Sequence, residues 1–94
     1  MENKTTTYKI RQVIELTGVS EFLLRVWEDR YKAFAPPRTK TGRRLYSEND
    51  ILKARALLAL TQKGVRIGDI AQLSLGKLNR MLENGAVAEV KKET

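Results

Sequence analysis

Hydrophobic residues recur at helical spacing in five segments of the chain, and polar or turn-forming residues separate these segments. The first stripe contains Ile10, Val13, Ile14 and Leu16, and Gly18 follows it as a residue that ends helices at positive φ. The pattern predicts helices at about residues 10–17, 20–31, 48–62, 67–73 and 75–82.

The second helix divides into two faces. Ser20 is a good N-cap, and Glu21 suits the positive end of the helix dipole. At 100° per residue, one face holds Ser20, Leu24, Trp27, Glu28 and Tyr31, and it should meet the core. The opposite face holds Phe22, Arg25, Val26 and Asp29. A short turn therefore joins two helices, the second of which presents a cation and two apolar groups outward.

A short basic hairpin is predicted after this helix pair. Pro36-Pro37 should end the second helix, because proline lacks an N–H and restricts the residue before it. Residues 37–46 then favour two short strands with a turn near Thr41-Gly42, which we interpret as a wing. Leu45 and Tyr46 should anchor the wing to the core, although the Tyr46 hydroxyl could instead donate to a phosphate.

The remaining helices should support this pair. Ser47 and Asp50 form a variant of the capping box before a long helix, whose stripe of Ile51, Leu52, Ala54, Leu57, Leu58 and Leu60 ends near Gly64. Residues 1–7 and 84–94 lack a regular apolar face, so we expect a disordered leader and a flexible tail around one domain at 8–83. The predicted fold is mainly α, a winged helix-turn-helix with a two-stranded β wing and a supporting helix pair.

Charge and composition narrow the function. The chain carries a net charge of +7, and residues 8–46 hold nine basic and four acidic side chains, against eight and six in 47–94. This excess favours a polyanionic partner, nucleic acid ahead of membrane. The sequence has neither cysteine nor histidine, which excludes disulfides, zinc fingers and catalysis by an imidazole. We therefore expect that the protein is not an enzyme and holds no metal site. Without a signal core or a long apolar run, a cytoplasmic location is expected.

Candidate DNA-contacting residues come from three places: the start of the first helix, the second helix and the wing. They are Lys9, Arg11, Ser20, Glu21, Phe22, Arg25, Val26, Arg30, Tyr31, Arg38, Lys40, Arg43, Arg44 and Tyr46. An arginine on the outward face could bond a guanine edge or a phosphate, and apolar groups could touch thymine methyls. A basic wing beside a helix pair could contact the backbone or the minor groove.

The sequence allows more than one role for several of these side chains. Arg25 could contact base or phosphate, and Phe22 could contact a thymine or fold back over the protein. Trp27 is expected to pack in the core rather than to stack on a base. Glu28 is expected to anchor Arg30 or a backbone amide, because no second group accompanies it for acid–base chemistry.

The segments IRQVIELTGVS, LLRVWEDRYK and PPRTKTGRRLYSENDI, in this order, resemble the DNA-binding domain of the MerR family of bacterial transcription regulators. The resemblance covers residues 8 to about 82. It implies a winged helix-turn-helix with a recognition helix at 20–31 in the major groove, and DNA contacts from Arg25, Arg43 and Arg44. Lys32 replaces the usual glycine of the family and Val26 replaces a more common aromatic or polar group, so base preference should differ.

Trp27-Glu28, the GRRLYS segment and Ile70-Ala71-Gln72-Leu73-Ser74 resemble most the branch with cobalamin-binding light sensors. In that branch a separate C-terminal domain holds the cobalamin, so we expect no cofactor in these residues. Family members commonly dimerise through a long helix after this domain. We therefore expect a monomer or weak dimer as a DNA-binding module, and an oligomer for a longer protein.

The leading hypothesis is sequence-specific binding of double-stranded operator or promoter DNA by a transcriptional regulator, with repression or activation left open. A second hypothesis is a protein-interaction module, whose basic face binds an acidic partner that mimics DNA. A third is an accessory DNA-binding factor in recombination or excision.

Overall fold

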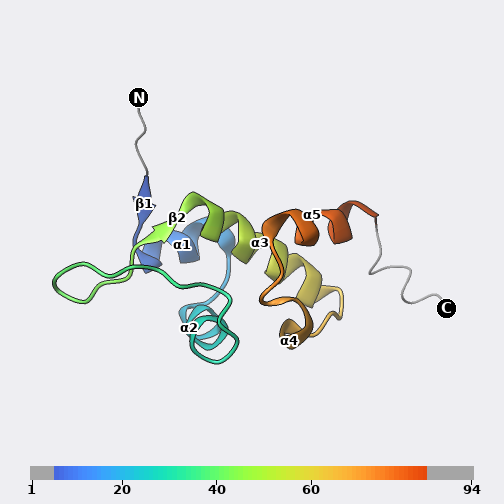
Figure 1. Cartoon of the computed structure of the whole chain (residues 1–94), viewed down its shortest axis with the longest axis horizontal. Coiled ribbons are helices and arrows are strands. Elements are labelled where there is room, and N and C mark those ends of the chain that lie inside the picture. The colour runs from blue at the N-terminus through green and yellow to red at the C-terminus, as the bar shows by residue number, and fades with distance from the viewer. Residues whose placement is uncertain (1–5, 85–94) are drawn as a thin grey trace.

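The structure, a computed structural model, describes residues 6–84 (Figure 1). It contains five helices and one two-stranded sheet within that range. In chain order the elements are β1 (Thr7–Tyr8), α1 (Ile10–Thr17), α2 (Glu21–Asp29), β2 (Tyr46–Ser47), α3 (Glu48–Gln62), α4 (Ile67–Ile70) and α5 (Leu75–Asn84). The structure confirms the fold predicted from the sequence, in which a helix pair is followed by a wing and by supporting helices.

The helix pair α1–α2 turns at the predicted glycine. Gly18 has φ +81°, in the left-handed region, and its N–H donates to the Ile14 carbonyl at 2.9 Å, which closes α1. Val19 is fully buried in the turn, and the Ser20 hydroxyl accepts from the Leu23 N–H at 3.1 Å to begin α2. Local capping therefore fixes where the second helix starts.

The second helix is shorter than predicted. α2 ends at Asp29, and the chain then reverses at Lys32, whose φ of +57° is left-handed, while the Ala33 N–H donates to the Trp27 carbonyl at 2.9 Å. The prediction that Pro36-Pro37 ends this helix was wrong. The buried Phe34 already belongs to the core by that point, where its ring packs edge-on against Tyr46 at 6.3 Å between centroids.

Lys53 of α3 ties the loop that follows α2 to the scaffold. Its Nζ donates to the Ala33 carbonyl at 2.8 Å and lies 5.9 Å from the centre of the Phe34 ring. Burial lowers the pKa of Lys53, although Asp50 acts in the opposite direction. This contact holds the loop between α2 and the wing against the rest of the domain.

The wing is a hairpin, but its regular sheet lies elsewhere than predicted. Two backbone hydrogen bonds, both 2.8 Å long, join the arms of residues 37–46: the Thr39 N–H donates to the Arg43 carbonyl, and the Leu45 N–H donates to the Pro37 carbonyl. Gly42 forms the turn with φ +87°. Only an isolated bridge, Arg38 with Arg44, forms within it. The antiparallel strands are β1 and β2, with Thr7 opposite Ser47 and Tyr8 opposite Tyr46.

That pairing corrects the expected leader. Thr7 was assigned to a disordered segment, but its backbone pairs with the base of the wing. Residues 1–5 and the predicted tail from Gly85 lie outside the described residues, and α5 includes Asn84, one residue beyond the predicted domain limit.

The scaffold helix α3 follows the prediction closely. Ser47 and Asp50 exchange side-chain and backbone hydrogen bonds at 3.1 and 3.0 Å, and Leu57 and Leu60 are fully buried. Leu52, which was placed in the buried stripe, is instead 41% exposed, and Leu16 of α1 is similarly exposed. α5 packs along α3 and closes the core at the opposite end from the wing (Figure 1).

Candidate nucleic-acid interface

The two faces of α2 are divided largely as predicted, except that Ser20 of the predicted core face is exposed and Val26 of the predicted outward face packs against the core. Leu24 and Trp27 are buried in the core, which confirms the packing role of Trp27, whereas Phe22 is 73% exposed and Arg25 is also exposed. Val26 is half-buried beside the core. Phe22 and Arg25 therefore lie together on the solvent-facing side of α2.

Arg25 is paired on its own helix. Its Nε and one Nη atom donate to a single carboxylate oxygen of Glu21, one turn earlier, at 2.9 and 2.7 Å. Both side chains are about half exposed, at 46% and 51%, so the pair contributes little to stability and can be redirected by a ligand. Glu21 therefore orients Arg25 in the free protein without burying it.

Glu28 joins α2 to the wing. Its carboxylate accepts from Arg44 Nε at 3.0 and 2.9 Å and from the Tyr46 hydroxyl at 3.0 Å, while one Nη of Arg38 lies 3.9 Å away. The expectation that Glu28 anchors Arg30 or a backbone amide was wrong, because Arg30 is exposed at the end of the helix. The true partners are sixteen and eighteen residues later, and no local spacing rule indicates them.

This contact changes the proton affinity of both partners. The hydrogen bond to Glu28 raises the pKa of Arg44 against the opposing effect of burial. Burial, followed by the negative charge of Glu28, raises the pKa of the Tyr46 hydroxyl, which therefore remains a donor well into the alkaline range. Tyr46 is only 1% exposed, so its hydroxyl is not available to a phosphate, and the anchoring role is the one observed.

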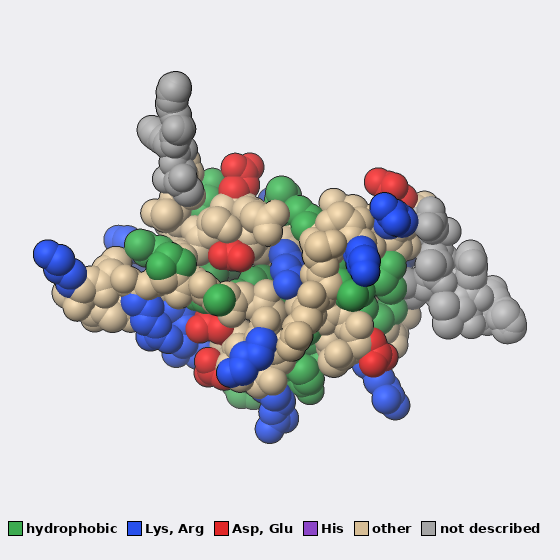
Figure 2. Space-filling model, in the orientation of Figure 1, with side chains coloured by type: hydrophobic (Ala, Val, Ile, Leu, Met, Phe, Trp, Pro, Cys, Tyr) green, Lys and Arg blue, Asp and Glu red, His purple; other side chains and the backbone are tan. Residues whose placement is uncertain are grey.

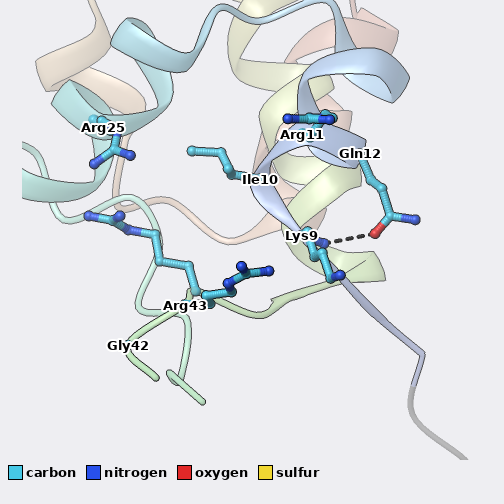
Figure 3. Close-up of a pocket in the computed structure, with 8 residues that line it drawn as sticks. Lys9, Ile10, Arg11, Gln12, Arg25, Gly42 and Arg43 are labelled. Atoms are coloured by element: carbon cyan, nitrogen blue, oxygen red, sulfur yellow. Dashed lines mark hydrogen bonds between the residues drawn. The ribbon is translucent and has the colours of Figure 1, made fainter. Parts of the chain in front are cut away.

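The start of α1, the outward side of α2 and the wing border one open cleft of about 630 Å³ (Figure 3). Five cations line it: Lys9, Arg11, Arg25, Arg43 and Arg44. They come from three segments that are distant in the sequence, and Figure 2 shows Lys and Arg side chains gathered beside the wing. Such a concentration of positive charge around a concave surface favours a polyanion.

Sequence reasoning missed part of the cleft lining. Ile10, Gln12 and Gly42 also border it. The Gln12 side chain accepts from the Lys9 N–H at 2.9 Å, and the Gln12 N–H donates to the Lys9 carbonyl at 2.9 Å. In the first turn of α1 the amides of Ile10 and Arg11 are therefore the potential donors to an anion. The position of Gln12 three residues after the N-cap was the signal that could have identified it.

The other predicted residues lie outside the cleft. The Ser20 hydroxyl is used by its helix cap, and Lys40 is exposed in the turn of the wing. Tyr31 packs toward α4, and a Cβ on Gly68 would lie 3.5 Å from the Tyr31 ring. The Tyr31 carbonyl accepts from the Gln72 side chain at 3.3 Å. Arg38 donates to the Gly42 carbonyl at 3.4 Å and so braces the wing.

This fold and this basic surface define a winged helix-turn-helix protein. The family model described as MerR HTH family regulatory protein matches residues 8–77, and the chain belongs to that family. Within the described part, residues 6–84, no helix has the length and apolar character needed to cross a membrane.

Relatives of known name support the same assignment. The chain is 40% identical over 84 residues to the HTH-type transcriptional repressor CarH of Myxococcus xanthus, covering 89% of this chain and 26% of CarH. It is 33% identical over 87 residues to the HTH-type transcriptional regulator GlnR of Bacillus cereus, covering 93% and 64%. The chain thus spans about a quarter of the first relative and less than two thirds of the second.

A solved structure shares the fold. The crystal structure of a MerR family transcriptional regulator from Bacillus cereus superposes with a TM-score of 0.62 over 90% of this chain and 75% of that chain, at 20% sequence identity. At that identity the likeness concerns the fold alone.

Proposed function

We propose that this chain binds double-stranded DNA sequence-specifically, as the DNA-binding part of a cytoplasmic transcriptional regulator. The observation that carries the proposal is the common cleft, because α2 and the wing both border it with cations. In this arrangement α2 enters the major groove while the wing contacts the backbone or the adjacent minor groove.

The dimensions and chemistry of α2 suit base recognition. An α-helix with its side chains is about 10–12 Å across, and a major groove about 12 Å wide admits it. Phe22 would meet thymine methyl groups, with Val26 behind it, and Arg25 would meet a guanine edge or a phosphate. The buried Leu24 and Trp27 hold the helix against the core, so that its outward face is presented rigidly.

The cleft cations suit the phosphate backbone. Lys9 and Arg11 flank the start of α1, where free amides and the helix dipole also favour an anion. Arg43, exposed in the wing, approaches from the other side. Each phosphate that is neutralised releases counterions, so binding should weaken steeply as salt concentration rises.

We further propose that regulatory input lies outside this chain. Its relatives are longer, and CarH is named as a repressor, which makes repression the outcome to test first. A cobalamin, if the full protein uses one, would be held by another domain. A second copy of the module would let the protein bind two half-sites, which would raise its affinity over that of a single module.

The experiment is selection of binding duplexes from a random double-stranded library, followed by titration at several salt concentrations. We expect an enriched motif that binds roughly a thousandfold more tightly than its scrambled version, which is the lower end of the preference that specific DNA-binding proteins show. Equal affinity for both duplexes would contradict sequence-specific recognition.

An acidic protein that mimics DNA is a second candidate partner, because the five cations and Phe22 would serve it equally. Such a partner should compete with DNA and lose affinity when Arg43 and Arg44 are both replaced by alanine. Simultaneous binding of the partner and DNA would refute a shared surface.

A further inference from the structure

Glu28 is the only charged side chain that is buried in the described part of the chain, at 8% exposed. A carboxylate is costly to remove from water unless it accepts hydrogen bonds and faces a positive charge. Arg44 and Tyr46 meet both needs, from the far side of the hairpin. One carboxylate on α2 therefore holds the base of the wing.

The contact uses only part of Arg44. Nε donates to both oxygens of Glu28, while the hydrogen bonds found within residues 6–84 include none from its two Nη groups. The Arg44 side chain is 13% exposed and borders the cleft together with Arg25 and Arg43. An arginine held by its Nε has lost most of its rotamer freedom, yet its terminal donors stay available for a further anion.

We propose that Glu28 is a positioning residue for DNA recognition: it fixes Arg44 and the wing relative to α2, so that the helix and the wing can reach one DNA site together. This inference rests on the proposed function. Glu28 touches no DNA in this account and acts through Arg44.

The charge of Glu28 separates this role from simple fold stabilisation. A carboxylate beside the cleft opposes the approach of any DNA, so its removal should favour sequence-independent binding. Loss of the Glu28 carboxylate should also release Arg44 and the wing. This release weakens binding only to a duplex whose recognition requires Arg44 and the wing to be correctly placed. A change that moves specific and nonspecific affinity in opposite directions is not expected from partial unfolding.

The test compares Glu28→Gln with wild type on a duplex selected with the wild-type protein and on its scrambled version. We expect the selected duplex to bind about tenfold more weakly and the scrambled duplex to bind equally well or more tightly. Glu83→Gln is the matched control, since it makes the same charge change on exposed α5 at the far end from the wing, and it should leave the affinity ratio unchanged (Figure 1).

Two further measurements show whether Glu28 acts through Arg44. In an Arg44→Met background, Glu28→Gln should cause no additional loss of affinity for the selected duplex. In wild type, the Arg44 Nε–H should give an exchange-protected signal in a nitrogen–proton NMR spectrum, and this signal should disappear in Glu28→Gln. If Glu28→Gln does not fold, Arg44→Lys serves instead, because it keeps the charge but lacks the Nε fork, and the same tenfold loss is expected.

Equal factors of change on both duplexes, or an undiminished effect of Glu28→Gln in the Arg44→Met background, would overturn the inference. Failure of the proposed function would look different, because wild type itself would then show no preference for a selected duplex.

Discussion

Arg44 in the wing donates its Nε to both carboxylate oxygens of Glu28 in α2, at 3.0 and 2.9 Å, and Tyr46 donates to the same carboxylate from the base of the wing. Arg44 and Glu28 are sixteen positions apart in the sequence, and they belong to the wing and to α2. The ion pair thus joins α2 and the hairpin.

Tyr46→Phe should abolish a loss of stability at high pH. The pKa of the Tyr46 hydroxyl is higher in the folded state than its ordinary value near 10, so the folded state retains this proton longer than the unfolded state. Its contribution is complete below pH 10 and declines above it, at about 1.4 kcal/mol per pH unit for one proton.

The measurement is urea unfolding of wild type and Tyr46→Phe between pH 8 and pH 11.5. The difference in unfolding free energy between them should be constant to about pH 10 and then shrink. The lowered pKa of Lys53 makes stability rise with pH below the ordinary lysine pKa, which is the opposite trend. Because both proteins contain Lys53, its effect cancels in this difference. A constant difference across the whole range would contradict the buried hydroxyl contact.

Lys32→Gly should stabilise the domain. Lys32 has φ +57°, which costs a residue with a side chain about 1–2 kcal/mol, and glycine avoids that cost while it loses about 0.5–1 kcal/mol through greater freedom in the unfolded chain. A net gain of about 0.5–1 kcal/mol is expected in thermal or urea unfolding. Lys32→Ala is the control for the lost charge, and a gain of equal size in that variant would refute the conformational explanation.

The elements with local signals could be predicted from the sequence. Helical periodicity together with Gly18 correctly predicted the bounds of α1, and Ser47 correctly predicted the start of α3. The spacing of 100° per residue also placed Trp27 and Phe22 on opposite faces of α2. The early end of α2 was missed because it depends on a left-handed lysine, which is rare for a residue with a side chain.

Contacts between distant segments could not be predicted in the same way. A strand of two residues, Thr7–Tyr8, has no periodicity to detect, and it forms because the base of the wing offers it a partner. The same holds for Glu28, since a wheel places it toward the core but does not say which donor it meets. Net charge predicted a basic surface, whereas the cleft between α1, α2 and the wing required the tertiary structure.

Phe22→Ala should separate DNA binding from folding. Because the ring is 73% exposed, its removal should change stability by no more than about 0.5 kcal/mol. Affinity for a selected duplex should fall about tenfold, with little change for the scrambled duplex. Leu52→Ala is a matched control, since it removes an exposed apolar side chain from α3, and it should leave both affinities unchanged.

Arg43→Ala should weaken binding to every duplex by a similar factor and lower the slope of log affinity against log salt by about one, as expected for the loss of one phosphate contact. Titrations at four or more salt concentrations would measure this slope. An unchanged slope accompanied by lost specificity would instead assign Arg43 to a base.

Glu21→Gln should increase sequence-independent affinity for DNA by about threefold, because it removes an exposed carboxylate beside the cleft residue Arg25 and releases the Arg25 side chain. Glu48→Gln is the matched control, because Glu48 is also exposed at the first position of a helix. Equal gains in the two variants would show that net charge alone is responsible.

The most direct test of the DNA surface is NMR mapping of the backbone amides during titration with a selected duplex. The largest shifts should cluster at the start of α1, along the outward face of α2 and in residues 37–45 of the wing. Shifts confined to α3, α4 and α5 would contradict the account.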